Sequence, residues 1–236
     1  MTNDGVTDSQ GCHLAASRAL RQDMRVSQPT MPSVADSWAR IDAWLAAHAP
    51  ASLAALRPPA HPDSIADAQH ELGVELPAEL VASLSCHDGL HQSANLLPEA
   101  QPLAAHRIVE HWQMCMEIAG DTGLQPRPWD DEPWWHPLWI PWAEAAGGDA
   151  QVIDLRPGPS QGRLGWAVHD AGGDFSDAWP SLTAYLHAVA EALHVGGGVG
   201  PWYPYLRVDD GLWWDFAGES ELNGEPLRPA PVGLPP

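Results

Sequence analysis

The stretch "WIPWAEAAGGDAQVIDL", residues 139–155, decides the fold. Its first half is apolar and aromatic, and its second half has the pattern of a β-strand. Gly147 and Gly148 stand between the halves and permit the positive φ angles of a tight turn. The stretch predicts two strands folded back on each other, with Asp149 and Asp154 making caps or local hydrogen bonds. We interpret it as architecture and not as a catalytic site.

Short apolar segments divided by Gly and Pro turns predict the individual strands. They are "PLWI" (137–140), "AQVIDL" (150–155) and "RLGWAV" (163–168). "PYLRV" (204–208) and "GLWWDF" (211–216) predict a hairpin across the turn at residues 209–211.

Amphipathic periodicity predicts five helices. They are expected over residues 33–48, 63–72, 77–88, 105–119 and 181–193. Ser33 is the expected N-cap of the first helix, Asp63 or Ser64 that of the second, and Gly73 and Gly120 are expected just past helix ends. Helices first, antiparallel strands next and a covering helix late in the chain predict an α+β domain with a mostly antiparallel sheet.

The ends of the chain differ in composition from the middle. Residues 1–31 mix polar and charged residues with little periodicity, which predicts a disordered N-terminal arm. Residues 217–236 are rich in Pro, Gly and Glu, which predicts a disordered tail. A single domain over 32–216, including the hairpin, is expected between them.

The charge balance limits the possible partners. The chain has 11 Arg, no Lys and 31 acidic residues, for a formal net charge of −20. So acidic a chain repels phosphate backbones, which argues against nucleic-acid binding. It attracts basic surfaces and so favours a basic protein partner. The alternative is that the charge only keeps a protein with 13 Trp in solution.

Cysteine usage and hydropathy indicate the compartment. Cys12, Cys86 and Cys115 are too few and too scattered for a disulfide framework, as in a reducing cytoplasm. The N-terminus lacks the basic and apolar regions of a signal peptide. No apolar run approaches the roughly 18 residues that span a membrane. We therefore expect a cytoplasmic protein without membrane partners.

The segment "GPSQG" (158–162) matches the G-x-S-x-G pattern of serine hydrolases. A nucleophile elbow needs a strand before the serine and a helix after it. Here the strand expected at 163–168 follows Ser160, so the pattern favours a hairpin turn.

No metal or cofactor site is predicted. Cys86, His87, Asp88 and His91 include possible metal ligands, but no CxxC or HExxH pattern accompanies them. We interpret His87 as lying at a helix C-terminus, where the helix dipole favours its charged form. The glycine-rich segment 196–200 precedes no helix and the chain has no Lys for a Walker-type loop, so it is interpreted as a flexible connector.

The segment "WDDEPWWHPLW" (129–139) combines tryptophans with carboxylates. Aromatic anchors beside acidic residues suit a binding hot spot for a basic partner. The alternative is that these tryptophans cover the core beneath a loop ordered by prolines.

The order of these segments resembles that of the SUKH superfamily, in its Smi/Knr-type branch of fungal cell-wall-synthesis regulators and bacterial immunity proteins. The likeness covers residues 34–195. It rests on the opening helix with Trp38 and Trp44, on "ELGVELPAELVASLSCHDG" (71–89), on "LWIPWAEAAGGDAQVIDLRPG" (138–158) and on the late helix "SLTAYLHAVAEAL" (181–193). The 125–137 insert and the 211–216 hairpin depart from the family's pattern.

The resemblance implies a binding module without catalytic residues, since many bacterial relatives neutralise toxins, often nucleases, of polymorphic toxin systems. We therefore expect an immunity protein with a basic toxin as its partner. The alternatives are a regulatory scaffold like the fungal relatives and, less favoured, a hydrolase that uses Ser160. The expected partner-binding residues are Asp88, Trp129, Asp130, Asp131, Glu132, Trp134, Trp135, Glu144, Asp149 and Asp174.

Overall fold

The stretch 139–155 forms two antiparallel strands, β2 (Trp139–Ala145) and β3 (Ala150–Asp154), as predicted. The turn between them has Gly148 at a φ of 94°, a left-handed conformation that glycine adopts without strain. These coordinates are a computed structural model that describes residues 31–121 and 132–235. The predicted N-terminal arm therefore lies outside the described residues, except for Met31.

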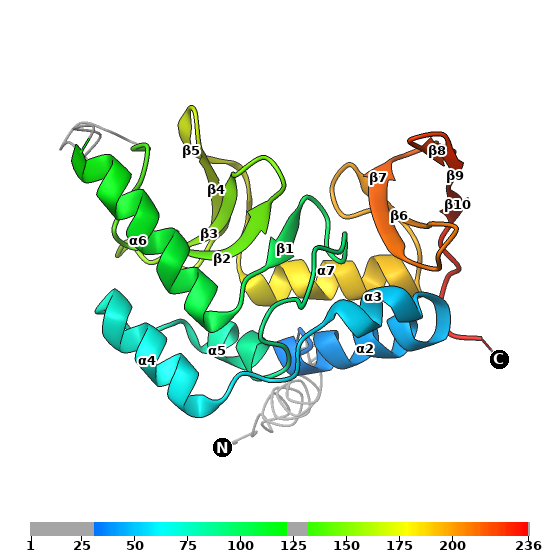
Figure 1. Cartoon of the computed structure of the whole chain (residues 1–236), viewed down its shortest axis with the longest axis horizontal. Helices are drawn as coiled ribbons and strands as arrows, with labels where there is room; N and C mark the ends of the chain where they lie inside the picture. The colour runs from blue at the N-terminus through cyan, green and yellow to red at the C-terminus, as the bar shows by residue number, and fades with distance from the viewer. Residues whose placement is uncertain (1–30, 122–131, 236) are drawn as a thin grey trace, which may run out of the picture. The chain divides into compact units, whose positions relative to one another are not determined.

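Five strands form one antiparallel sheet in sequence order (Figure 1). The others are β1 (Ala100–Pro102), β4 (Leu164–Val168) and β5 (Gly172–Trp179). The sequence analysis missed β1 and β5. The first has only three residues, and the second, "GGDFSDAW", is rich in Gly and Asp, which have low β propensity.

A proline interrupts strand β2, where it removes one backbone donor from the sheet. The register with β3 shifts between Pro141 and Ala143, so Trp142 sits in a bulge. The Trp142 carbonyl accepts a hydrogen bond of 2.9 Å from the Leu103 N–H. The Trp142 carbonyl thus has a partner although Trp142 is not paired with β3.

Apolar side chains bury both faces of the sheet. Ile140, Ile153 and Leu164 belong to the main core. On the other face, Trp139 and Val152 pack in a second cluster with residues of helix α6 (Ala105–Asp121) and of the 134–135 loop. Strand β3 is buried along its whole length. The sheet is therefore an interior layer, as expected for an α+β domain.

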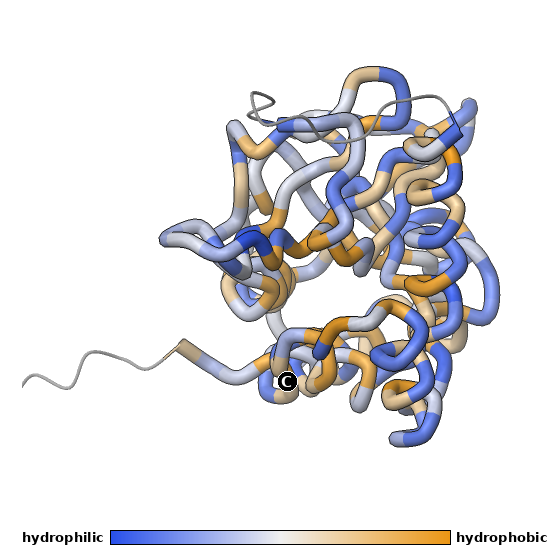
Figure 2. The backbone as a smooth tube through the Cα atoms, turned by 90° about the vertical axis from the view of Figure 1, so that its left-hand side faces the viewer, coloured by the Kyte–Doolittle hydropathy of each residue, from blue (hydrophilic) through white to orange (hydrophobic). Residues whose placement is uncertain are grey.

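Six helices are described, and five of them are predicted by the periodicity of the sequence. The six are α2 (Val34–His48), α3 (Pro50–Ala55), α4 (Pro62–Leu72), α5 (Ala78–Leu84), α6 (Ala105–Asp121) and α7 (Leu182–His194). The short helix at Pro50–Ala55 was not predicted, and the third predicted helix ends at Leu84 and not at residue 88. Their backbone alternates between hydrophobic and hydrophilic residues, as one-sided burial requires (Figure 2). None of the helices in 31–121 and 132–235 is long and apolar enough to cross a membrane.

The helix ends confirm some predictions and correct others. Ser33 caps α2 in a reciprocal capping box with Asp36, and Gly73 ends α4 at a φ of 68°. The cap of α4 is His61, whose ring accepts from the Asp63 N–H, and not Asp63 or Ser64, because Pro62 occupies the first helical position. Helix α6 includes Gly120, since an interior glycine costs a helix only about 1 kcal/mol.

The predicted hairpin forms from β6 (Trp202–Leu206) and β7 (Leu212–Phe216). Strand β10 (Arg228–Pro229) pairs with β6, and β8 (Glu221–Leu222) pairs with β9 (Glu225–Pro226). Residues 217–235 thus differ from the disordered tail predicted for them.

The segment after β10 is held against helix α2. The buried Trp44 indole donates to the Pro231 carbonyl at 3.0 Å, and His48 Nε2 lies 2.8 Å from the Gly233 carbonyl. Backbone pairing and these side-chain contacts order a segment whose composition alone suggests a tail.

His87 joins α2 to the loop after α5. Its Nε2 lies 3.0 Å from the Asp42 carboxylate and its Nδ1 lies 3.1 Å from the Arg57 carbonyl. Both partners only accept, so only the protonated imidazolium satisfies both. Burial lowers the pKa of His87, but the hydrogen bond and charge of Asp42 outweigh burial and raise it above its usual value.

We predict that Asp42→Asn destabilises the fold more in mild acid than in mild base. A raised folded-state pKa contributes stability that is complete below the unfolded-state pKa and is lost as the pH rises through the folded-state pKa. The expected loss is about 1–3 kcal/mol near pH 6 and smaller near pH 9. Urea unfolding at both pH values measures it, and Asp67→Asn, an exposed site on α4, is the control. An equal loss at both pH values would contradict the ion pair.

Candidate functional site

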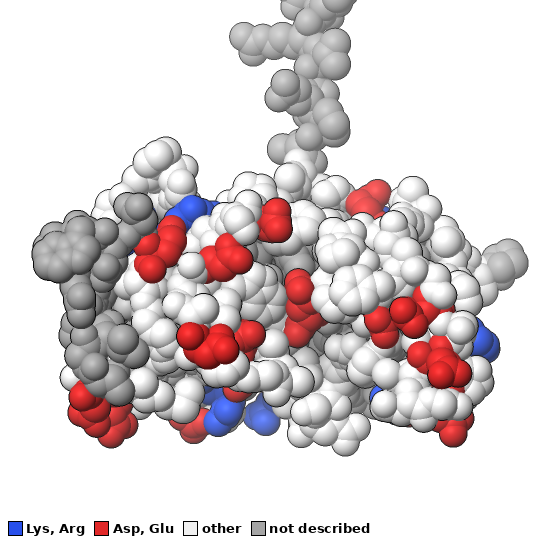
Figure 3. Space-filling view, turned by 90° about the horizontal axis from the view of Figure 1, so that it is seen from above, with Lys and Arg blue, Asp and Glu red and all other residues white. Residues whose placement is uncertain are grey.

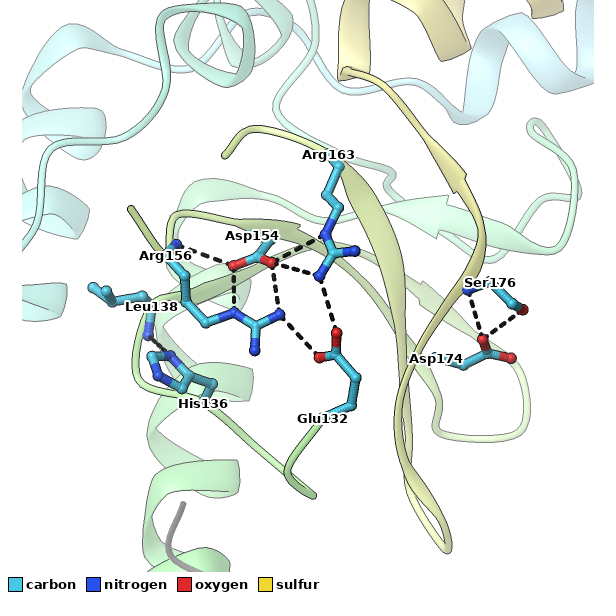
Figure 4. A network of polar contacts seen from close by, with 8 residues as sticks. All are labelled: Glu132, His136, Leu138, Asp154, Arg156, Arg163, Asp174 and Ser176. Atoms are coloured by element: carbon cyan, nitrogen blue, oxygen red, sulfur yellow. Dashed lines mark hydrogen bonds and ion pairs between the residues drawn. The ribbon is translucent and has the colours of Figure 1, made fainter. Parts of the chain in front are cut away.

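Glu132 belongs to a partly buried charge network (Figure 4). Its carboxylate lies 2.9 Å from Arg156 Nη2 and 3.0 Å from Arg163 Nη2. Both guanidinium groups also donate to Asp154, whose side chain is 3% exposed. We call these residues the arginine network.

The network is balanced because two carboxylates meet two guanidinium groups. Burial raises the pKa of the Asp154 carboxyl, but the hydrogen bonds and charge of Arg156, with help from Arg163, hold it below its usual value. The Arg163 guanidinium also lies 4.0 Å from the centre of the Phe175 ring. The arginine network thus holds the 132–139 segment against the end of the sheet.

Asp149 and Glu144 lie at the two ends of the β2–β3 connection. The Asp149 carboxylate accepts from the His169 backbone N–H at 2.9 Å and lies 2.7 Å from His169 Nδ1. Hydrogen bonding to Asp149 raises the pKa of the His169 imidazole. Glu144 is 32% exposed and lies 3.7 Å from Arg107 and 3.9 Å from His111. Asp149 therefore joins two turns, whereas Glu144 stays partly open to a partner.

The tryptophans of the 129–139 segment divide between core and surface. Trp135 is 2% exposed and packs in the second cluster, where its ring lies 6.1 Å from Trp139. Trp134 is half-buried, and its indole donates to the His169 carbonyl at 2.9 Å. The structure gives Trp135 the core-covering position and leaves part of Trp134 accessible. Trp129, Asp130 and Asp131 lie outside the described residues.

The Asp88 side chain has a structural role at the start of helix α6. Its carboxylate accepts from the Ala105 N–H at the start of α6 at 2.8 Å and lies 3.8 Å from Arg57. Carboxylates are favoured at this end of a helix by the unpaired N–H groups and the dipole. The described members of the predicted face are thus spread over the domain, and most hold structure in place.

A cavity of about 470 Å³ lies on the sheet face that packs toward α7. Its walls include the aromatic side chains of Trp166, Trp179, Tyr185 and Trp202. Trp179 meets Tyr185 edge to face with ring centres 5.6 Å apart, and Trp202 stacks on Phe216 at 4.8 Å. These contacts hold the rings in place. We call this site the aromatic cavity.

The sheet register builds the floor of the aromatic cavity. Gln151 of β3 pairs with Trp166 of β4, and Trp166 pairs with Asp174 of β5. Directly paired residues share one face of a sheet. Three side chains that are distant in sequence therefore stand side by side.

Three carboxylates line the aromatic cavity, those of Glu99, Asp174 and Asp177, and its lining contains no Arg, Lys or His. Among the described residues, none of the three forms an ion pair. Burial raises the pKa of Glu99. The nearby Trp202 indole opposes this, although no hydrogen bond of good geometry joins the two. The cavity is thus acidic and uncompensated, unlike the arginine network.

Of the predicted partner-binding residues, only Asp174 lines the aromatic cavity. The others were missed because Trp166 has the pattern of an ordinary strand residue, Trp179 lies in the unpredicted strand β5, and Glu99 lies in the irregular segment before β1. One local signal is visible in the backbone, since Glu99 has a φ of 64°, which is uncommon for a residue other than glycine.

Other candidate groups lie in structural settings. Ser160 occupies the turn between β3 and β4, so a strand and not a helix follows it, as predicted. Burial raises the pKa of the Cys115 thiol to about 12 and also raises that of Cys86, which disfavours thiolate chemistry. Within 31–121 and 132–235, no group of three or more His, Cys, Asp or Glu side chains is placed to hold a metal ion.

Comparison with known proteins agrees with this fold. The model of the SMI1 / KNR4 family (SUKH-1) matches residues 59–188, and the chain belongs to this family. The predicted resemblance is confirmed, although the match begins after helices α2 and α3. A "Glucan synthesis regulatory protein" of Neurospora crassa is 22% identical over 234 residues, covering 80% of this chain and 44% of the relative. The chain thus spans less than half the length of this relative.

We predict that Asp154→Asn costs about 3 kcal/mol of stability near pH 7, because it leaves partly buried guanidinium groups with less negative charge. A lowered folded-state pKa contributes stability that is present above the unfolded-state pKa and is lost as the pH falls through the folded-state pKa. The difference from wild type should therefore shrink in acid. Denaturant unfolding across the pH range measures it.

The matched control is Glu110→Gln, which removes the exposed Arg107–Glu110 pair of 2.6 Å and should cost less than about 0.5 kcal/mol. Equal losses in the two variants would show that the arginine network contributes no more than a surface pair.

Proposed function

We propose that this chain is a non-enzymatic immunity protein that neutralises a cognate toxin of a bacterial polymorphic toxin system. The family match over residues 59–188 carries the proposal, because the resemblance implies this role for many bacterial members. The net charge of −20 favours a basic toxin domain, such as a nuclease, since opposite charge speeds encounter. On the face drawn in Figure 3, Asp and Glu side chains are widely scattered and Arg side chains are few. A cytoplasmic location belongs to the proposal, because there the protein meets a toxin made in or delivered to the same cell.

Two observations support binding in place of catalysis. Ser160 lies in a strand–turn–strand setting that does not form a nucleophile elbow. The described cysteines have raised pKa values, whereas nucleophilic cysteines need lowered ones.

The proposed contact surface uses a subset of the predicted residues, each of which keeps part of its side chain exposed. Among the described residues these are Trp134, Glu144 and Asp174, and Trp129, Asp130 and Asp131 remain part of the proposal. A half-buried tryptophan suits an anchor for a partner, and exposed carboxylates favour a basic one.

A regulatory scaffold is the second candidate, and the name of the Neurospora crassa relative favours it. The two roles differ in genetic setting. A toxin gene beside this one favours immunity, and an isolated gene favours a regulatory role.

We predict that the open reading frame beside this gene encodes a growth-arresting toxin, and that this chain restores growth when both are expressed in one bacterium. The purified pair should form a complex that weakens as salt rises, because salt screens the attraction between exposed charges. Growth curves and calorimetry measure these effects. A toxic neighbour that this chain does not neutralise, or a neighbour without toxicity, would contradict the immunity role.

Variants of the same complex locate the surface. Trp134→Ala should weaken binding by about tenfold or more, as expected for an aromatic anchor, and Glu144→Gln should weaken it less. Glu75→Gln, an exposed site after α4, is the control with the same charge change. Equal affinities for all three variants would place the surface elsewhere.

A further inference from the structure

The floor of the aromatic cavity contains a buried amide donor that the protein leaves unused. Gln151 is 3% exposed, and its side-chain oxygen accepts from the Trp142 indole at 2.9 Å. This bond fixes the orientation of the amide. No described residue accepts from its amide nitrogen, which is not fully enclosed and can be reached by a group in the cavity. A buried polar group of this kind is usually hydrogen-bonded, so the nitrogen offers a donor to whatever enters the cavity.

The walls above Gln151 have the chemistry that recognises an organic cation. Indole faces attract cations, and the rings of Trp166, Trp179 and Trp202 line the cavity. Glu99, Asp174 and Asp177 add carboxylates without any described counter-charge. Glu99 and Tyr185 both line the cavity, and burial raises the pKa of the Tyr185 hydroxyl, which the charge of Glu99 raises further.

We propose that the aromatic cavity is a receptor for an arginine side chain of a partner polypeptide, with its guanidinium group among the indole rings and carboxylates and a partner backbone carbonyl on the Gln151 amide. A planar guanidinium stacks on indole and has five N–H donors, so it can serve several carboxylates at once. The volume of about 470 Å³ lies within the range of ligand sites and admits a side chain with its adjoining backbone.

Charge decides between an acidic and a basic occupant. An anion or a carboxylate-bearing segment would bring like charge next to three carboxylates, which is unfavourable. A purely apolar segment would cover the Gln151 donor and the carboxylates of Glu99 and Asp177 without giving them partners. Asp174, by contrast, already accepts from the Ser176 N–H and hydroxyl. A basic polypeptide satisfies all of these groups.

The inference rests on the protein-binding role proposed above and adds the chemistry of one contact. It does not rest on the immunity role, because its test uses synthetic probes and no toxin. A failed growth rescue with an intact arginine site would reject immunity alone, and a successful rescue without an arginine site would reject this inference alone.

The test titrates the full chain with the peptide acetyl-Ala-Gly-Arg-Gly-Ala-amide and with the same peptide carrying neutral citrulline in place of arginine. Indole N–H signals in two-dimensional NMR report binding, with Trp166, Trp179 and Trp202 assigned through single Trp→Phe variants. The arginine peptide should shift these signals and bind at least about tenfold more tightly than the citrulline peptide. This comparison needs no variant that might disturb folding.

A pair of double variants with equal charge change tests the location. Asp174→Asn with Asp177→Asn should weaken the arginine peptide by about tenfold, because it removes two cavity carboxylates. Asp67→Asn with Glu75→Gln removes two exposed carboxylates on and after α4 and should leave binding within about twofold of wild type.

Three outcomes would overturn the proposal. They are equal binding of the arginine and citrulline peptides, equal loss in the two double variants, and shifts confined to indoles outside the cavity, such as that of Trp134. Agmatine supplies the guanidinium group without a backbone carbonyl. If it bound as tightly as the arginine peptide, the occupant would be a small cation and not a polypeptide.

Discussion

Strand β3 is buried over its full length, yet it carries two polar side chains that must find partners inside the protein. Asp154 accepts hydrogen bonds from Arg156, in the turn after β3, and from Arg163, just before β4. Gln151 finds only one, the Trp142 indole. The hydrogen bonds of Asp154 fix one end of the sheet. Gln151 uses only its amide oxygen, so its amide N–H donors remain available in the aromatic cavity. Both sites of interest follow from the burial of one strand.

The contrast between the two sites shows how an acidic protein distributes its few cations. The arginine network uses two of the 11 Arg residues to neutralise Glu132 and Asp154 within the fold. The aromatic cavity receives none. The net charge of −20 is thus not spread evenly, because the structure compensates the carboxylates it must bury and leaves others open. A patch of carboxylates beside fixed aromatic rings is therefore a better guide to recognition than the total charge.

The sequence predicted the helices and the central strands because their apolar spacing is periodic and their ends carry recognisable residues. Residues 139–155 gave β2, β3 and the turn, and the G-x-S-x-G pattern at Ser160 was correctly interpreted as a turn because a strand pattern follows it. Strand β5 was not predicted because Gly, Asp and Ser make up most of its sequence. Its extended structure depends on pairing with β4.

The candidate site was harder to predict, because proximity in the fold decides it. The composition of the 129–135 segment suggested Glu132 and Trp135 as binding residues. In the structure Glu132 belongs to the arginine network and Trp135 is buried in the core. The aromatic cavity depends on the register of three strands and on Trp202, which begins strand β6 of another sheet. Spacing within one segment carries no information about such neighbours.

The contact between helix α2 and the segment after β10 has a consequence for biosynthesis. The partner carbonyl of Trp44 lies 187 residues further along the chain, and that of His48 lies 185 residues further. A ribosome makes the helix early and these acceptors late, so the indole of Trp44 waits without its native partner while the intervening residues are added. The two hydrogen bonds that hold this segment against α2 can therefore form only after residues 231–233 have been synthesised, long after the helix itself.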